Sequence, residues 1–244
     1  MLLHGWTATA DINFYKCYRP LAERFRVLAF DHRGHGSGIK SRRPFRLADC
    51  ADDIIALADH LGVQSFVPVG YSLGGAVAQL VARRQPALVS GIVLCSTAAR
   101  FRGIPITRRT YYGLSSVAAM MRVTPPAARR RLVDRYFSQR KQGDWDPWAL
   151  ELAASHDWRM VLEAGAALGT FDSTPWVGLL DQPASVVITE RDDVVPPARQ
   201  HELADLLDAV AFDIDAGHDA AVSAPHLFLP AVMAAIDSVV ERAA

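Results

Sequence analysis

The stretch Val67-Pro68-Val69-Gly70-Tyr71-Ser72-Leu73-Gly74-Gly75-Ala76 decides the fold, because an apolar run enters Gly-x-Ser-x-Gly and a helical pattern leaves it directly. This order requires a tight strand-to-helix turn whose apex residue takes strained backbone angles. Glycine is expected at Gly70 and Gly74 because a Cβ there would collide across the turn. The turn presents the Ser72 hydroxyl and the backbone N–H of Leu73 at the positive end of the following helix. Ser72 is therefore a candidate nucleophile, against the alternative of a glycine turn with an idle serine.

Short apolar runs alternate with helical patterns on both sides of this motif. The runs predicted as strands cover residues 27–30, 65–69, 92–95, 185–188 and 210–214. The predicted helices cover residues 47–61, 76–84, 197–207 and 225–240. Such alternation predicts an α/β fold, with a mostly parallel sheet that is covered by helices on both faces.

Residues 100–176 interrupt the alternation, because they contain no clear strand and are rich in Arg, Ala, Met and Trp. A segment of this length far exceeds a normal crossover between strands. We therefore predict a core of residues 1–99 and 177–244 with a helical cap inserted at 100–176. Large apolar side chains of this cap either pack it on the core or line an apolar pocket: Phe101, Met120, Met121, Trp148, Trp158 and Trp176. The basic run Arg129-Arg130-Arg131 is interpreted as a solvated helix face, with an anionic substrate group or a membrane surface as the alternative.

The composition excludes several classes of protein. Of the 244 residues, 50% are hydrophobic, and 26 Lys+Arg balance 26 Asp+Glu, which argues against a nucleic-acid binder. No run approaches the roughly 20 apolar residues of a membrane span. The cysteines Cys17, Cys50 and Cys95 lack paired spacing, which favours reduced thiols over disulfides or zinc. With no secretory signal at the start, we expect a cytoplasmic protein with no metal, a small-molecule substrate as its partner, and homo-oligomerisation left open.

A serine nucleophile needs a base, and the base needs an orienting carboxylate. His218 is the candidate base because Ala216-Gly217-His218 follows the last predicted strand, at the sheet edge where catalytic groups gather. The carboxylate is expected in the charged loop after residues 185–188. Spacing alone leaves three candidates there: Glu190, Asp192 and Asp193.

A second backbone N–H beside that of Leu73 is needed to bind a developing oxyanion. The loop His4-Gly5-Trp6-Thr7 follows the opening apolar stub and is placed to supply it. Gly5 allows a close approach of the backbone, and the N–H of Trp6 is the candidate donor. His4 is expected to brace this loop by hydrogen bonding.

Five stretches together resemble the α/β-hydrolase fold superfamily, in its serine-nucleophile, esterase/lipase-like branch with a helical cap. They are His4-Gly5-Trp6, Asp31-His32-Arg33-Gly34-His35-Gly36, Gly70-Tyr71-Ser72-Leu73-Gly74-Gly75, the Asp192 loop and Gly217-His218. The resemblance spans the chain except the cap, and the order Ser…Asp…His is the one that the superfamily uses.

The resemblance implies roles for individual residues. Ser72 corresponds to the nucleophile, His218 to the base and Asp192 to the acid, because Thr189-Glu190-Arg191-Asp192 aligns with the family's Gly-x-x-Asp. Thr189 stands where that pattern has glycine, so Asp193 is kept as a reserve acid. Relatives carry two more strands before the His-Gly strand, whereas only Met1-Leu2-Leu3 precedes it here. The N-terminal edge strands are thus expected to be missing, which would leave a sheet edge exposed.

The implied activity is that of a serine hydrolase. It would cleave a carboxylic ester, or a related acyl bond, of a small to medium apolar substrate through an acyl-enzyme on Ser72, with no cofactor. Alternatives on the same triad are a cofactor-free perhydrolase or haloperoxidase-like enzyme, a C–C bond hydrolase, a thioesterase or lactonase, and an acyltransferase. From other classes, a non-catalytic protein that binds a small ligand and an interaction module using the basic cap remain open.

Overall fold

The computed structural model describes residues 1–102, 113, 116–117, 119–120, 122–125, 127–128, 131 and 147–243. Within these residues, one sheet is formed by β1 (Leu2–Leu3), β2 (Val69–Tyr71), β3 (Ile92–Cys95), β4 (Ala184–Thr189) and β5 (Val210–Ile214). The strands lie in this order, and every neighbouring pair is parallel. All carboxyl ends therefore meet at one edge, as the predicted α/β class requires.

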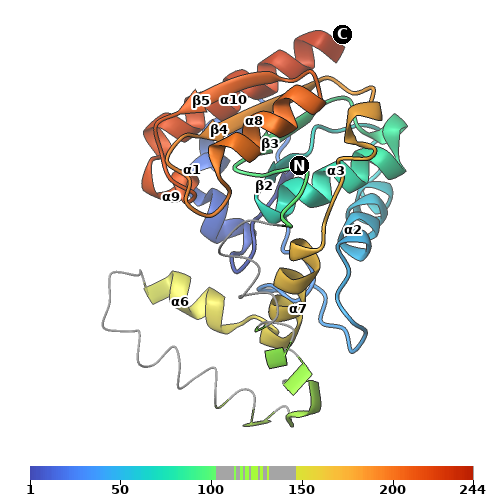
Figure 1. Ribbon diagram of the computed structural model, residues 1–244, viewed down its shortest axis with the longest axis vertical. Coiled ribbons are helices and arrows are strands. Elements are labelled where there is room, and N and C mark those ends of the chain that lie inside the picture. Colours follow the sequence, from blue (N-terminus) through green and yellow to red (C-terminus); the bar gives the residue numbers. More distant parts are fainter. Residues whose placement is uncertain are drawn as a thin grey trace.

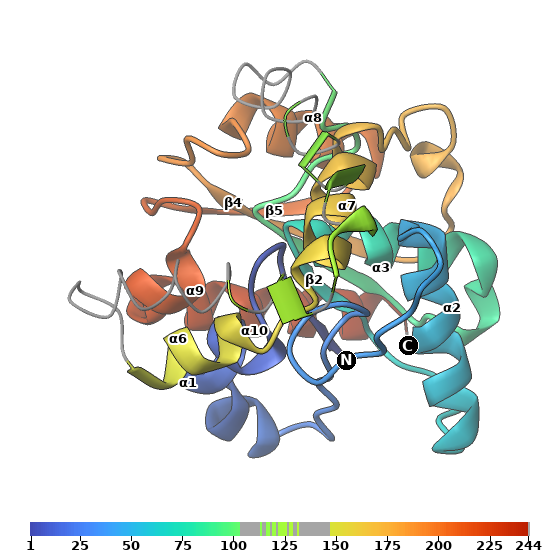
Figure 2. The ribbon, with the colours of Figure 1, turned by 90° about the horizontal axis from the view of Figure 1, so that it is seen from below.

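Helices cover both faces of the sheet (Figures 1 and 2). One face carries α1 (Ala10–Ala22), α9 (Ala220–Ser223) and α10 (Pro225–Ala243), and the other carries α2 (Leu47–His60), α3 (Leu73–Arg84) and α8 (Pro197–Leu206). Successive strand residues alternate between the faces: Leu94 and Val186 pack with α3 and α8, whereas Val93 and Val187 pack with α10. None of the described helices has both the length and the apolar character needed to cross a membrane.

Two predicted strands are shorter than the sequence suggests. In residues 27–30 only Ala29 forms a bridge, with Leu2, because the neighbouring strand β1 is only two residues long. One backbone hydrogen bond joins the two segments, from Leu2 N to Leu28 O at 2.8 Å. In residues 65–68 only Phe66 forms a bridge, since Pro68 has no N–H for a ladder. The predictions of full strands at these two places were wrong.

The segment 27–30 forms an edge of the sheet. No further strand lies beside it in the described part of the chain. A surface cavity of about 390 Å³ adjoins this edge and is lined mainly by apolar side chains, among them Leu21, Phe25, Val27, Phe66 and Val240.

Two helices of the predicted cap are described, α6 (Pro147–Ala154) and α7 (Trp158–Gly169), and Figure 1 shows them at the end of the molecule away from the C-terminus. Met160 and Ala164 of α7 pack into the same cluster as Leu73, so α7 is fastened to the core. Phe101 is buried against Phe171, and Met120 is exposed. Met121 and the pair Arg129-Arg130 lie outside the described residues, and the division into core and cap stays a prediction.

Candidate active site

The turn between β2 and α3 holds Ser72 in a strained conformation. Its φ of 52° and ψ of −112° are values that non-glycine residues rarely adopt, at a cost of about 1–3 kcal/mol. Two bonds hold it there: the N–H of Ser72 donates to Cys95 O at 2.9 Å, and the hydroxyl of Thr97 donates to Ser72 O at 2.7 Å. Cys95 is the last residue of β3, and Thr97 lies two residues beyond it. The end of the neighbouring strand therefore holds Ser72 in its strained conformation.

Glycine is required on both sides of Ser72, for two different reasons. A Cβ at Gly70 would lie 2.5 Å from the carbonyl oxygen of Gly74, which confirms the expected collision across the turn. A Cβ at Gly74 would lie 2.0 Å from the carbonyl oxygen of Leu3, so at this position the collision would be with β1. The second glycine therefore lets α3 pack directly on the strand that leads into the 4–7 loop.

The structure brings Ser72, His218 and Asp192 into one chain of hydrogen bonds. Ser72 Oγ lies 3.1 Å from His218 Nε2, and His218 Nδ1 lies 2.8 Å from Asp192 Oδ2. Because an ionised carboxylate can only accept, Nδ1 carries the proton and Nε2 is free to accept from the serine hydroxyl. Ser72 and Asp192 are buried, and the His218 side chain is partly exposed. A serine, a base and an orienting acid thus meet in the arrangement that activates a hydroxyl nucleophile.

The carboxylate of Asp192 is held on both oxygens. Oδ1 accepts from the backbone N–H groups of Val194 at 2.9 Å and Val195 at 2.7 Å. Oδ2 accepts from His218 and also from the Thr189 hydroxyl, at 2.8 Å. Charge-assisted bonds of this kind compensate for the burial of the carboxylate.

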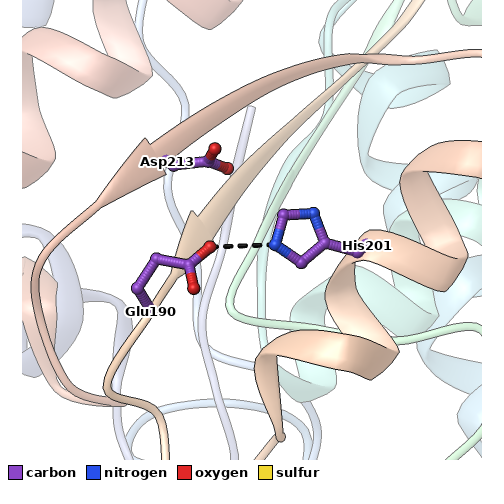
Figure 3. A group of neighbouring side chains, drawn as sticks. All are labelled: Glu190, His201 and Asp213. Carbon is purple, nitrogen blue, oxygen red and sulfur yellow. Dashed lines mark hydrogen bonds and ion pairs between the residues drawn. The ribbon is translucent and has the colours of Figure 1, made fainter.

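The other two acid candidates point elsewhere. Asp193 is exposed, and Glu190 makes an ion pair with His201 of α8, at 2.9 Å between Oε1 and Nε2. Glu190, His201 and Asp213 form the one group among the described residues whose ligand atoms could hold a metal ion, all within 4.8 Å of one another (Figure 3). Two of its members are exposed. An ordinary surface ion pair accounts for the geometry.

Tyr71 contacts both the backbone and the ring of His218, the candidate base. Its hydroxyl donates to the backbone carbonyl of His218, and its ring packs edge-on against the imidazole, at 5.9 Å between centroids. Burial raises the pKa of Tyr71, so the phenol stays a neutral donor. Neither the Gly-x-Ser-x-Gly motif nor the spacing of residues in the sequence predicts this contact, because it joins residues 147 positions apart.

The loop His4–Thr7 lies beside Ser72, as a Cβ at Gly5 would be 3.4 Å from Ser72 Cβ. His4 braces it as expected: Nε2 accepts from the His32 N–H at 2.9 Å, and Nδ1 donates to Gly5 O at 2.7 Å. Further bonds fix the loop from three sides, from Gly5 N to Asn13 Oδ1, from Trp6 Nε1 to Val161 O and from His156 Nε2 to Thr7 O. The loop is therefore rigidly placed.

Two backbone donors near Ser72 are unused in the described part of the chain. The N–H of Leu73 opens α3, where the first amides have no partner within the helix. The N–H of Trp6 also donates to no described group. Both are thus available to an anionic oxygen.

The cysteines do not offer a rival nucleophile. Cys17, Cys50 and Cys95 are all buried. Burial raises the pKa of the Cys17 thiol to about 11 and also raises the pKa of Cys50 and Cys95. Since the thiolate is the reactive form, these thiols are inert at neutral pH.

Four histidines, one of them in the 4–7 loop, form a cluster with their rings in contact: His4, His32, His35 and His156. Both ring nitrogens of His32 are buried and meet no hydrogen-bond partner among the residues that the structure describes. Burial, together with repulsion between the protonated forms of His32 and His35, lowers the pKa of His32 to about 3. Burial likewise lowers the pKa of His4, His35 and His156, so the cluster is neutral in the folded protein at physiological pH.

This cluster predicts a loss of stability in acid. Unfolded histidines take up a proton near pH 6.5, whereas folded His32 does so only near 3, so its contribution is complete above about pH 6.5 and falls toward pH 3. Urea unfolding at pH 5 should show a free energy of unfolding about 2 kcal/mol lower than at pH 7 from His32 alone. His32→Leu should reduce this pH dependence, and the exposed-site control His60→Gln should not. An unchanged pH dependence in His32→Leu would contradict the assignment.

Comparison with known proteins places this architecture in a family. The chain matches the family model described as alpha/beta hydrolase fold over residues 1–225. A non-heme chloroperoxidase of Streptomyces lividans is 29% identical over 210 residues, 80% of this chain and 74% of that relative. The bifunctional esterase/perhydrolase DCH of Acinetobacter calcoaceticus is 40% identical over 94 residues, 38% of this chain and 34% of the relative.

A solved structure extends the likeness to the whole chain. The thermophilic esterase from Thermogutta terrifontis has a TM-score of 0.77 at 26% identity, and the match covers 98% of this chain and 89% of that one. This chain belongs to the α/β hydrolase fold family. It is an enzyme of the α/β hydrolase superfamily.

Proposed function

We propose that this enzyme is a serine hydrolase that cleaves a carboxylic ester, or a related acyl bond, through an acyl-enzyme on Ser72. The observation that carries the proposal is the continuous chain from Ser72 Oγ to His218 Nε2, at 3.1 Å, and from His218 Nδ1 to Asp192 Oδ2, at 2.8 Å. These are distances at which a proton passes from a serine to an imidazole. The esterases among the relatives support the same class of reaction.

In the first half of the reaction, Ser72 Oγ attacks the ester carbonyl carbon as His218 Nε2 takes the hydroxyl proton. The carbonyl oxygen becomes an anion, and we assign the N–H groups of Trp6 and Leu73 as its donors. Collapse of this intermediate breaks the bond to the alcohol, which leaves with the proton from His218. In the second half, His218 removes a proton from water, and the resulting attack releases the acid and restores Ser72.

Asp192 acts through His218. Its carboxylate keeps the proton of the imidazole on Nδ1 and stabilises the imidazolium while the proton of Ser72 is in transit. The four hydrogen bonds that it accepts from His218, Thr189 and the backbone of Val194 and Val195 stabilise the charged form. The rigid 4–7 loop contributes by holding the N–H of Trp6 in place before the substrate arrives, so no reorganisation is required during the reaction.

For the substrate we propose a small to medium apolar ester. Trp6 belongs to the loop beside Ser72 and packs against the core, and residues 100–176 are rich in apolar side chains. Apolar walls with few polar groups are typical of sites for such substrates. Hydrolysis of p-nitrophenyl esters of increasing acyl length tests this, with kcat/KM expected to rise from the acetate to the medium-chain esters.

Covalent labelling tests the nucleophile without knowledge of the substrate. A fluorophosphonate probe is expected to modify the wild-type protein at Ser72. The activated Oγ attacks phosphorus, the P–F bond breaks and fluoride leaves, while the Trp6 and Leu73 amides bind the phosphoryl oxygen. Peptide mass mapping should place the adduct on the peptide with Ser72. Ser72→Ala should remain unlabelled. The wild-type protein should also remain unlabelled when it is denatured before the probe is added. A binding protein with an idle serine would not label.

Perhydrolysis is a second candidate, favoured by the names of two relatives, the esterase/perhydrolase and the chloroperoxidase. In this reaction hydrogen peroxide replaces water in the second half, so that attack on the acyl-enzyme releases a peracid and restores Ser72. Peracid formation from acetate ester and peroxide, measured beside hydrolysis, separates the two. Equal dependence of both on Ser72 would show that they share one acyl-enzyme.

A further inference from the structure

Thr189, the last residue of β4, shares an oxygen of Asp192 with the base. The Thr189 hydroxyl lies 2.8 Å from Asp192 Oδ2, the same distance at which His218 Nδ1 meets that oxygen. Thr189 is fully buried, and the Asp192 side chain has no exposed surface. Solvent therefore does not compete for this oxygen, and its basicity depends on the protein groups around it.

Gln200 of α8 determines which way the Thr189 hydroxyl points. Gln200 Oε1 accepts from the Thr189 N–H at 3.0 Å, so the amide nitrogen faces the hydroxyl and donates to it at 3.0 Å. The same nitrogen donates to Val195 O at 2.8 Å, which fixes the amide plane. With its oxygen accepting from Gln200, Thr189 directs its own proton to the strongest nearby acceptor, the Asp192 carboxylate.

We propose that Thr189 is a positioning residue that sets how strongly Asp192 holds the imidazole of His218. The inference rests on the proposed function, since it concerns the acid of that same triad. A hydroxyl that donates to a carboxylate stabilises the ionised form and lowers its affinity for a proton. It also fixes Oδ2 in line with His218 Nδ1. Thr189, oriented by Gln200, thus supplies to the buried Asp192 carboxylate a hydrogen bond of the kind that water supplies to an exposed one.

Removal of the hydroxyl has a predicted direction. Without Thr189 as a donor, the negative charge on Oδ2 is less compensated and attracts the imidazolium more strongly. The acid limb of the kcat/KM profile, which follows protonation of the base, should then move to higher pH. We expect kcat to fall about tenfold, the lower range of the effect of one hydrogen bond to a charged group. KM should be unchanged, because Thr189 is buried behind Asp192 and does not meet the substrate.

Three variants of one position separate this role from a packing role. Thr189→Val keeps the shape and removes the hydroxyl, Thr189→Ala removes both the hydroxyl and a methyl group, and Thr189→Ser keeps the hydroxyl. Each is assayed for p-nitrophenyl butyrate hydrolysis across pH, with thermal unfolding as the measure of folding. The valine and alanine variants should share the shifted acid limb, and serine should restore the native profile. If Thr189→Val has the native profile, or if Thr189→Ser is as impaired as Thr189→Val, the inference is overturned.

A double-mutant cycle tests whether Thr189 affects the reaction through Asp192. If Thr189 acts through Asp192, Thr189→Val should change the fluorophosphonate labelling rate about tenfold in the native background and not at all in Asp192→Asn. An equal effect in both backgrounds would overturn the inference. Failure of the proposed function is distinguishable, because the protein would then neither label at Ser72 nor lose hydrolysis in Ser72→Ala. If labelling and hydrolysis depend on Ser72 but substitution of Thr189 has no effect, the proposed function stands and only the role of Thr189 is overturned.

Discussion

Replacing Ser72 with alanine should lower kcat/KM for p-nitrophenyl butyrate by about 10⁴- to 10⁶-fold, the range expected when a covalent nucleophile is removed. Without Oγ no acyl-enzyme forms, and water must attack the ester directly. The residual rate above the uncatalysed reaction would come from substrate binding and from the N–H groups of Trp6 and Leu73.

The control for this variant must separate chemistry from folding. Ser72 has a φ of 52°, a strained value that alanine must also adopt, so thermal unfolding of Ser72→Ala should be measured beside its activity. Ser90→Ala removes a hydroxyl from an exposed serine and should retain native activity. A folded Ser72→Ala protein that keeps more than a few per cent of native activity would show that another group is the nucleophile.

Replacing Asp192 with asparagine should lower kcat by about 10⁴-fold, the magnitude known for the acid of a serine triad. Asparagine is nearly isosteric, but its NH₂ group cannot accept from all the donors that surround this position. If the amide oxygen faces the N–H groups of Val194 and Val195, its NH₂ faces His218 Nδ1. The imidazole then holds its proton on Nε2 and cannot accept the proton of Ser72.

The neighbouring acids provide matched controls. Asp193→Asn changes the same functional group one residue further on, at an exposed position, and Glu190→Gln breaks only the ion pair with His201. Both should leave kcat within about twofold of native, as expected for surface substitutions. A large loss in Asp193→Asn with a small one in Asp192→Asn would mean that the loop rearranges when substrate binds. Single-turnover assays would show whether the lost step is acylation.

Much of the fold follows from local patterns in the sequence. Short apolar runs rich in β-branched residues identify β3 and β4, because both strands are buried on both faces. The more mixed run Val210–Ile214 identifies β5, which is largely exposed, and apolar spacing identifies α2 and α10. The helix α1 was not predicted. Its sequence mixes polar and aromatic residues and contains Pro20, and its N-terminus depends on the Thr9 cap. Its apolar face is evident only where Phe14, Cys17 and Leu21 pack on the sheet.

The sequence by itself determined Ser72 and His218 as candidates, because glycines around a strand-to-helix turn and a Gly-His after the last strand are local features. It did not distinguish Asp192 from Glu190 and Asp193, since all three follow the same strand within four residues. Tertiary structure decided that only Asp192 points inward to His218, and that Thr189, Gln200 and Tyr71 surround the pair.

The physical reason lies in the range of the interactions. Backbone geometry at a turn depends on a few neighbouring residues, whereas the contact between Ser72 and His218 joins groups 146 positions apart. That contact forms because parallel strands deliver their carboxyl ends to one edge, and the direction of each side chain there is set by packing against α8 and β3. Local sequence therefore specifies which residues are presented at the edge, and the packed sheet specifies which of them meet.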